Sequence, residues 1–253
     1  MTQISIYIIT VKNIRNYDSL VGSLIQYFGV TPSIIWGITP KDLPCANTGT
    51  HLHEGRYRQL SCHEVAAALS HARARELAIS EGAEWAIFLE DDSELIQNDN
   101  LDFISNLLRL PSEVPFFVHL FPEQNGILSS SRIAGMNTIR KIPDYANAYA
   151  LNTQGLRCFL KNTNRSHLYL ADWPKFSRRI KKLAPIRSIF RHPLQSIDSS
   201  LISEEREGIH ASQMAFRLNY RFKQVIFKIS RIPFAKFGHE DIASENLRSV
   251  TWW

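Results

Sequence analysis

The stretch SCHEVAAALSHARARELAISEGAEWAIFLEDD, residues 61–92, decides the fold. Ser61, followed by Glu64 three residues later, forms a capping box that predicts the start of a helix, which continues through alanines and ends at Gly82. The residues after the glycine are typical of a buried strand that runs into three consecutive carboxylates. The segment therefore predicts a helix that leads into a buried strand of an α/β protein.

The beginning of the chain shows the same alternation of strand and helix. Residues 4–11 (ISIYIITV) and 33–38 (SIIWGI) predict strands, and apolar residues at helical spacing over 16–28 predict a helix that ends at Gly29. Such a β-α-β unit predicts parallel strands joined by a right-handed crossover. Further strands are expected at 116–121 and 147–152, helices at 100–109 and from Gln154, and a loop over 40–60.

Length and composition fit one large α/β domain, and the order of strands and helices predicts a single Rossmann-type domain with a mixed, mostly parallel sheet. The chain has 253 residues, 44% of them hydrophobic, which is enough to bury a large core. Its three cysteines form no C-x-x-C pair, which argues against a disulfide framework and a cysteine-based zinc site. We expect a cytoplasmic location, because neither a signal peptide nor an apolar run of about 18 residues is visible.

Charge is distributed unevenly along the chain, whose formal net charge is +5. Residues 1–140 contain 10 Lys and Arg against 15 Asp and Glu, whereas residues 141–253 contain 19 against 9. This asymmetry predicts two surfaces with different partners. We expect one domain over residues 1–200 and a basic, amphipathic helical extension over residues 201–253.

Within that extension, residues 214–237 carry six basic and six aromatic residues and no acidic one. Apolar residues at helical spacing favour a helix that lies on an anionic membrane surface. A helix packed on the domain with a solvated basic face accounts for the same pattern, and the alternation from Phe216 to Phe222 leaves a strand open. Nucleic acid is not expected as a partner, because no recognition motif accompanies the charge.

Three adjacent carboxylates, Glu90, Asp91 and Asp92, mark the candidate site. Ligands of open α/β sheets bind beyond the carboxyl ends of the strands, where these residues are expected. Adjacent carboxylates repel one another unless a cation or a proton intervenes, and Mg²⁺ or Mn²⁺ with oxygen ligands would also stabilise a departing diphosphate. The alternative is an acidic, solvated exit from the strand.

The helix before this strand carries polar residues on one face. Glu64 and His71 are seven residues apart and therefore lie on nearly the same side of the helix, with Ser70 beside His71. Because such a helix packs on the strand that it precedes, these side chains are candidates for the same site. A histidine among alanines is also common as a satisfied core residue.

The run RQLSCHEVAAALSHARARELAISEGAEWAIFLEDD, residues 58–92, resembles the L-S-x-x-E, L-S-H and W-A-x-x-L-E-D-D block of glycosyltransferase family 25. This family contains the bacterial lipooligosaccharide and lipopolysaccharide biosynthesis glycosyltransferases. The resemblance extends over roughly residues 4–200. Four further segments are similar to family elements in the same order: ISIYIITVKN, NAYALNTQGLRCFL, LADW and HPLQSIDSS.

The resemblance implies a GT-A fold and a metal-dependent, inverting transfer of a hexose from a UDP-sugar, commonly UDP-galactose. The acceptor would be a surface glycan or glycolipid at the cytoplasmic face of the inner membrane. Glu90, Asp91 and Asp92 would hold Mn²⁺ or Mg²⁺, and Asp92 would also be catalytic. The residues implied in binding the nucleotide sugar are Thr10, Arg15, Glu64, Ser70, His71, Glu90 and Asp91.

Inverting transfer also needs a base that takes the proton from the acceptor hydroxyl. Asp172 is the candidate, because it ends the strand-like run HLYLAD and matches the aspartate of the family's LADW-like element. An aspartate before Trp173-Pro174 is equally suited to capping a helix.

One departure from the family keeps another function open. The segment Trp36-Gly37-Ile38-Thr39 stands where the family has A-x-D-G, so an expected acidic contact is absent. The alternative is therefore a non-catalytic relative that binds a glycan or a partner glycosyltransferase. A nucleotidyltransferase is disfavoured, because no Gly-rich phosphate loop follows the first strand.

Overall fold

The computed structural model describes residues 4–11, 17–43, 51–52, 59–60, 62–96, 102–121, 128–139, 147–160 and 179–192. All of them belong to one compact unit, which ends at Glu207. Arg15, Asp172 and the extension over residues 201–253 lie outside the described residues, and so does the boundary expected after residue 200. Within the described part, no helix is long and apolar enough to cross a membrane.

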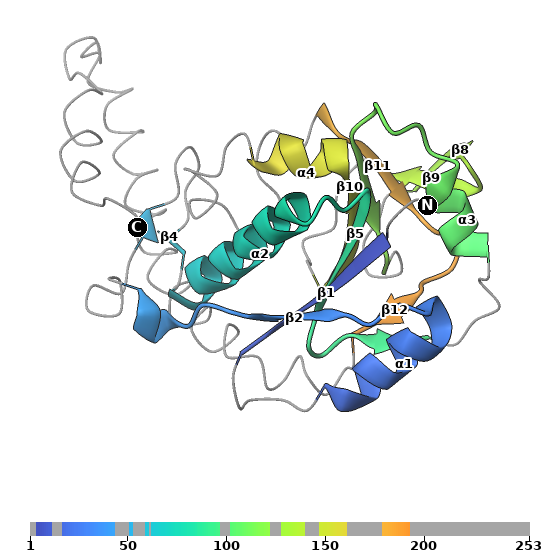
Figure 1. The fold of residues 1–253 in the computed structure, drawn as a ribbon. Helices are drawn as coiled ribbons and strands as arrows, with labels where there is room; N and C mark the ends of the chain where they lie inside the picture. Colours follow the sequence, from blue (N-terminus) through green and yellow to red (C-terminus); the bar gives the residue numbers. More distant parts are fainter. Residues whose placement is uncertain are drawn as a thin grey trace, which may run out of the picture. The chain divides into compact units, whose positions relative to one another are not determined.

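An eight-stranded sheet is the centre of the described structure. In spatial order its strands are β2 (Ser33–Trp36), β1 (Ile4–Thr10), β5 (Trp85–Glu90), β10 (Ala148–Asn152), β7 (Phe116–His119), β11 (Lys181–Ala184), β9 (Met136–Ile139) and β8 (Leu128–Ile133) (Figure 1). β10 and β9 run opposite to the other strands. The expected α/β class with a mixed, mostly parallel sheet is confirmed.

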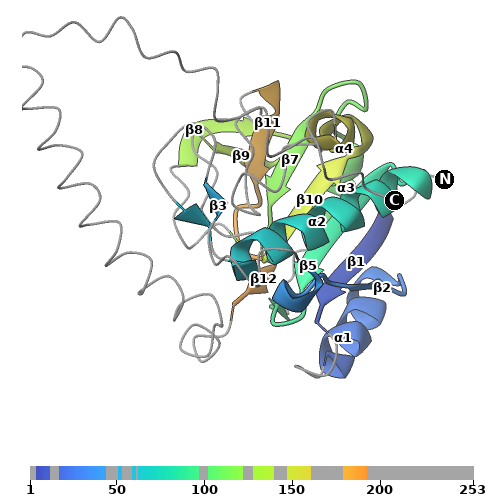
Figure 2. The same cartoon turned by 90° about the vertical axis from the view of Figure 1, so that its left-hand side faces the viewer.

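Helices cover both faces of this sheet, as Figures 1 and 2 show. Leu20 and Leu24 of α1 (Asp18–Phe28) and Leu107 of α3 (Asp102–Leu108) pack with the β1 residues Ile6 and Ile8. Tyr7 and Ile9 of β1 face the opposite way, because side chains alternate along a strand. They pack with the helices α2 (Cys62–Ser80) and α4 (Thr153–Leu160), which lie side by side.

Glycine ends two of these helices where the sequence predicts it. Gly29 after α1 and Gly82 after α2 have φ values of 65° and 72°, a left-handed conformation that few other residues adopt. Strand β2 is shorter than the predicted 33–38: the N–H of Gly37 still donates to the carbonyl of Thr10 at 2.7 Å, but the N–H of Ile38 donates to the hydroxyl of Ser70 and no longer to β1.

The region expected as a loop over residues 40–60 contains short elements. They are the 3₁₀ turn η1 (Pro40–Asp42) and the paired strands β3 (His51–Leu52) and β4 (Gln59–Leu60). Five more strands were not predicted: β8 and β9, which form a hairpin, β11, and the paired strands β6 (Glu94–Leu95) and β12 (Phe190–Arg191). Strand β11 places the basic residues Lys181 and Lys182 in the main sheet.

Candidate functional site

Residues Glu90, Asp91 and Asp92 form an acidic turn at the carboxyl end of β5, as predicted. The N–H of Asp91 donates to the carbonyl of Ile9 in β1 at 3.1 Å, and the N–H of Glu90 donates to the carbonyl of Asn147 at 2.8 Å. A bond of 3.0 Å from the N–H of Ser93 to the carbonyl of Glu90 closes the turn. The three carboxylates therefore stand on a backbone that is fixed from two neighbouring strands.

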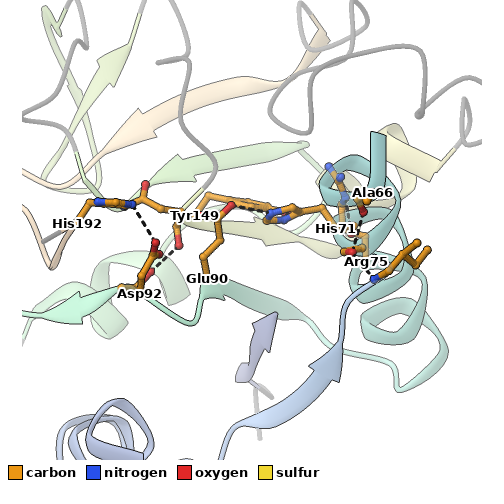
Figure 3. Close-up of polar contacts among 11 residues, drawn as sticks. Ala66, His71, Arg75, Glu90, Asp92, Tyr149 and His192 are labelled. Carbon is orange, nitrogen blue, oxygen red and sulfur yellow. Dashed lines mark hydrogen bonds and ion pairs between the residues drawn. The ribbon is translucent and has the colours of Figure 1, made fainter. Parts of the chain in front are cut away.

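The first two carboxylates are held by residues from different elements. Thr10 at the end of β1 donates from its hydroxyl to Oδ2 of Asp91 at 2.7 Å. Nε2 of His71 on α2 lies 3.3 Å from Oε1 of Glu90 (Figure 3). The structure thus brings four of the predicted donor-site residues together at one edge of the sheet.

The third carboxylate pairs with a residue that sequence analysis did not identify. Nε2 of His192 lies 3.1 Å from Oδ2 of Asp92, and the two side chains are only 16% and 10% exposed (Figure 3). His192 follows β12, and the pairing of Phe190 with Leu95 in β6 carries it to the acidic turn. No local motif reveals this contact, because it joins segments 100 residues apart through a two-residue strand.

His71 is a buried and neutral member of this network. Its Nδ1 lies 3.0 Å from the hydroxyl of Tyr149, and the side chain is 1% exposed. We assign the ring proton to Nε2, because the carboxylate of Glu90 can only accept and the Tyr149 hydroxyl can donate to Nδ1. Burial lowers the pKa of His71 and outweighs the opposing effect of Glu90.

A row of stacked rings fixes Tyr149. Its ring lies 5.1 Å from that of Phe88 and 5.7 Å from that of Phe117, and Phe88 stacks in turn on Tyr7 at 5.4 Å. The four rings come from neighbouring strands of the sheet. Since stacked aromatic side chains leave few alternative rotamers, the hydroxyl that faces His71 is held in place.

The other predicted residues on α2 are buried and have structural contacts. Ser70 accepts a hydrogen bond from the N–H of Ile38 at 2.7 Å and donates to the carbonyl of Ala66 at 2.8 Å. A Cβ atom at Gly37 would lie 3.1 Å from the Ser70 hydroxyl, so the small residue allows this close approach. Glu64, 2% exposed, lies in the first turn of the helix.

The predicted metal ion needs oxygen or nitrogen ligands that lie close together. Within the described residues, no three His, Cys, Asp or Glu side chains are grouped so that they could hold a metal ion. Asp92 and His192 nevertheless provide an oxygen and a nitrogen ligand side by side. Mg²⁺ and similar cations often bind through one or two protein groups and complete their shell with water and phosphate oxygens. A pair of protein ligands therefore fits a metal that binds together with a diphosphate.

Comparisons with known proteins give only distant similarities. No family model and no curated protein matches the chain. The structure is similar to a solved glycosyltransferase involved in glycosylation of the major capsid of PBCV-1, with 12% identity, 81% of this chain and 99% of that chain covered, and a TM-score of 0.38. It is also similar to mannose-1-phosphate geranyltransferase from Thermus thermophilus, with 12% identity, coverage of 76% and 75%, and a TM-score of 0.37. The resemblance to family 25 stays a prediction.

Proposed function

We propose that this protein is a glycosyltransferase that moves a hexose, with galactose as the leading candidate, from a UDP-sugar to a lipooligosaccharide, lipopolysaccharide or capsule glycan. The transfer would be metal-dependent and would invert the anomeric centre. The observation that carries the proposal is the contact between Asp92 and His192 at the carboxyl end of β5. A ligand pair at this edge, next to two further carboxylates, suits a site for a metal-bound diphosphate.

Asp92 and His192 would hold the cation, and Glu90 and Asp91 would face the donor. Mn²⁺ is favoured over Mg²⁺, because an imidazole nitrogen is a softer ligand than an oxygen. The cation would neutralise the charge of the departing diphosphate. Asp91 is fixed by Thr10 and Glu90 by His71, so neither carboxylate needs to reorient when the donor binds.

The remaining parts of the mechanism are proposals from sequence. Asp172 would take the proton from the acceptor hydroxyl, and Arg15 would contact the donor. The basic stretch over residues 214–237 would contact the anionic inner membrane, where a lipid-linked acceptor would be found.

The proposal is tested by measuring UDP release from UDP-galactose, UDP-glucose and a GDP-mannose control, each with Mn²⁺, Mg²⁺ or a chelator. We expect release of UDP from one UDP-hexose in Mn²⁺, stimulated by glycan acceptors and absent with the chelator. Metal-dependent binding of UDP without release in any condition would instead favour the non-catalytic relative. Absence of both binding and release would contradict the proposed function.

A further inference from the structure

Asn147, the residue before β10, has a buried side chain whose amide makes no hydrogen bond that the described residues show. It is 2% exposed, and its carbonyl accepts hydrogen bonds from the N–H of Glu90 at 2.8 Å and the hydroxyl of Ser93 at 2.7 Å. Within the part of the chain that the structure describes, neither Oδ1 nor Nδ2 of its amide has a hydrogen-bond partner. A buried amide without partners destabilises a fold, so its presence at a site indicates a ligand.

The strand register places this amide beside the acidic turn. Ala148 pairs with Leu89 across β10 and β5, so Asn147 stands opposite Glu90. Directly opposite residues of an antiparallel pair share one face of the sheet, and alternation puts Asn147 on the same face as Tyr149. Asn147 therefore extends the group formed by Tyr149, His71 and Glu90.

We propose that Asn147 and Glu90 together bind neighbouring hydroxyl groups of the donor hexose, an inference that rests on the proposed function. The amide can donate from Nδ2 and accept at Oδ1, and the carboxylate of Glu90 accepts. Hydroxyl groups meet both needs because each donates and accepts, whereas a phosphate would be repelled by Glu90. The sugar is also the part of the donor that is bonded to the diphosphate, which the proposed function places two residues further along the turn at Asp92.

A buried asparagine at the end of β10 is the matched control. Asn152 is also 2% exposed, but its Oδ1 accepts from the N–H groups of Phe116 and Gly155 at 2.9 Å, and its Nδ2 donates to the carbonyl of Val114 at 2.7 Å. Leucine is close to asparagine in size and apolar. N152L should lower the thermal midpoint of the free protein, because it removes these hydrogen bonds. N147L should maintain or raise the midpoint, because it replaces an amide that makes none within the described residues.

The decisive experiment titrates UDP and UDP-galactose, in Mn²⁺, into the wild type, N147L, N147A and N152L. We expect both Asn147 variants to bind UDP-galactose about tenfold more weakly than the wild type, and UDP within about twofold of it. Where N152L folds, its affinities for UDP and UDP-galactose should keep the wild-type ratio. N147A provides the same readout if N147L does not fold.

Three results would overturn the inference. An unchanged ratio of the two affinities in the Asn147 variants would show that the amide does not contact the sugar, for example because water satisfies it. An equal loss of affinity for both ligands in the Asn147 variants, together with a thermal midpoint lowered as in N152L, would show that Asn147 has a structural role. Failure of the wild type to bind UDP at all would remove the proposed function itself, and the inference with it.

Discussion

The two faces of the sheet are built differently. On the face covered by α1 and α3, the buried core runs from Ile6 and Ile8 to Leu24 and Leu107, and the polar residues that alternation places on this face, Thr10 and Asn152, are uncharged. On the face covered by α2 and α4, the cluster contains tyrosines, and buried polar residues such as His71 and Arg75 adjoin it. Both faces belong to the same strands, so the difference arises from alternate residues.

The comparison separates residues that stabilise the fold from residues that prepare a site. Apolar burial stabilises without regard to direction, whereas each buried polar group needs a correctly placed partner. His71 has partners on both nitrogens, and Arg75 donates to the carbonyl of His71 at 3.0 Å and lies 4.8 Å from the ring centre of Phe159. The buried titratable side chains His71 and Arg75 thus lie on the face covered by α2 and α4, where His71 reaches the acidic turn through Glu90.

The largest effect is expected at the acidic turn. D92N should reduce UDP release about a thousandfold, because the amide replaces a charged ligand that stabilises the leaving diphosphate, while the thermal midpoint stays near the wild-type value. Steady-state rates and a thermal melt measure the two quantities.

E113Q is the matched control for D92N. Glu113 is an exposed carboxylate before β7, at the opposite end of the strand from the site. E113Q should release UDP at the wild-type rate. If D92N also releases UDP at the wild-type rate, Asp92 is not a metal ligand.

The next effect concerns the apolar face. L24A should lower the free energy of unfolding by about 3 kcal/mol, because Leu24 is fully buried against β1 and leaves a cavity. Denaturant titration measures the loss, and UDP release below the melting range should remain unchanged. A strong loss of activity in the folded variant would contradict the proposal that the face covered by α1 and α3 stabilises the fold without contributing to the site.

A smaller effect is the pH dependence that His71 contributes to stability. Burial lowers its folded-state pKa below the ordinary value of 6.5, so the unfolded state takes up the proton more readily. This contribution is fully present above pH 6.5 and is lost as the pH falls below it, by at most about 1.4 kcal/mol per pH unit. H71Q should therefore show a shallower decline in unfolding free energy between pH 7 and 5 than the wild type. Parallel curves would mean that the pKa of His71 does not differ between the folded and unfolded states.

The smallest effect is expected from removing single hydroxyls of the ring stack. Y149F should lower the unfolding free energy by about 1 kcal/mol and also reduce activity, because His71 loses the donor that orients it. Y7F removes a comparable bond, donated to Oε2 of Glu81 at 2.6 Å, but away from the acidic turn. Its activity should therefore be unchanged. Equal activity of the two variants would contradict a positioning role for Tyr149.

Sequence predicted the parts of the fold that depend on local signals. The β-α-β opening, α2 and β5 follow from apolar periodicity and from glycines such as Gly29 and Gly82. Strand β11 was missed because its residues, Lys181 to Ala184, combine two basic side chains with only two apolar ones. Only its neighbours β7 and β9 in the sheet make it a strand.

The parts of the candidate site that follow from local sequence patterns were predictable, and the parts that depend on contacts between distant segments were not. The acidic turn and His71 follow from strand and helix patterns, and the structure joins Glu90 to His71. His192 and Asn147 could not be found, because their positions depend on pairings between distant strands. Alternation along residues 147–152 does put Asn147 and Tyr149 on one face, but only the register identifies Glu90 as their neighbour.

The most direct test of the central claim is the thermal midpoint of the wild-type protein with UDP, with and without Mn²⁺. Ligand binding to the folded state raises the midpoint by mass action, by an amount set by the affinity. We predict a clear rise with UDP and Mn²⁺ together, and little change with UDP and a chelator or with Mn²⁺ alone. The same rise with UDP in the presence of a chelator, or no rise in any condition, would contradict a metal-bound diphosphate at the acidic turn.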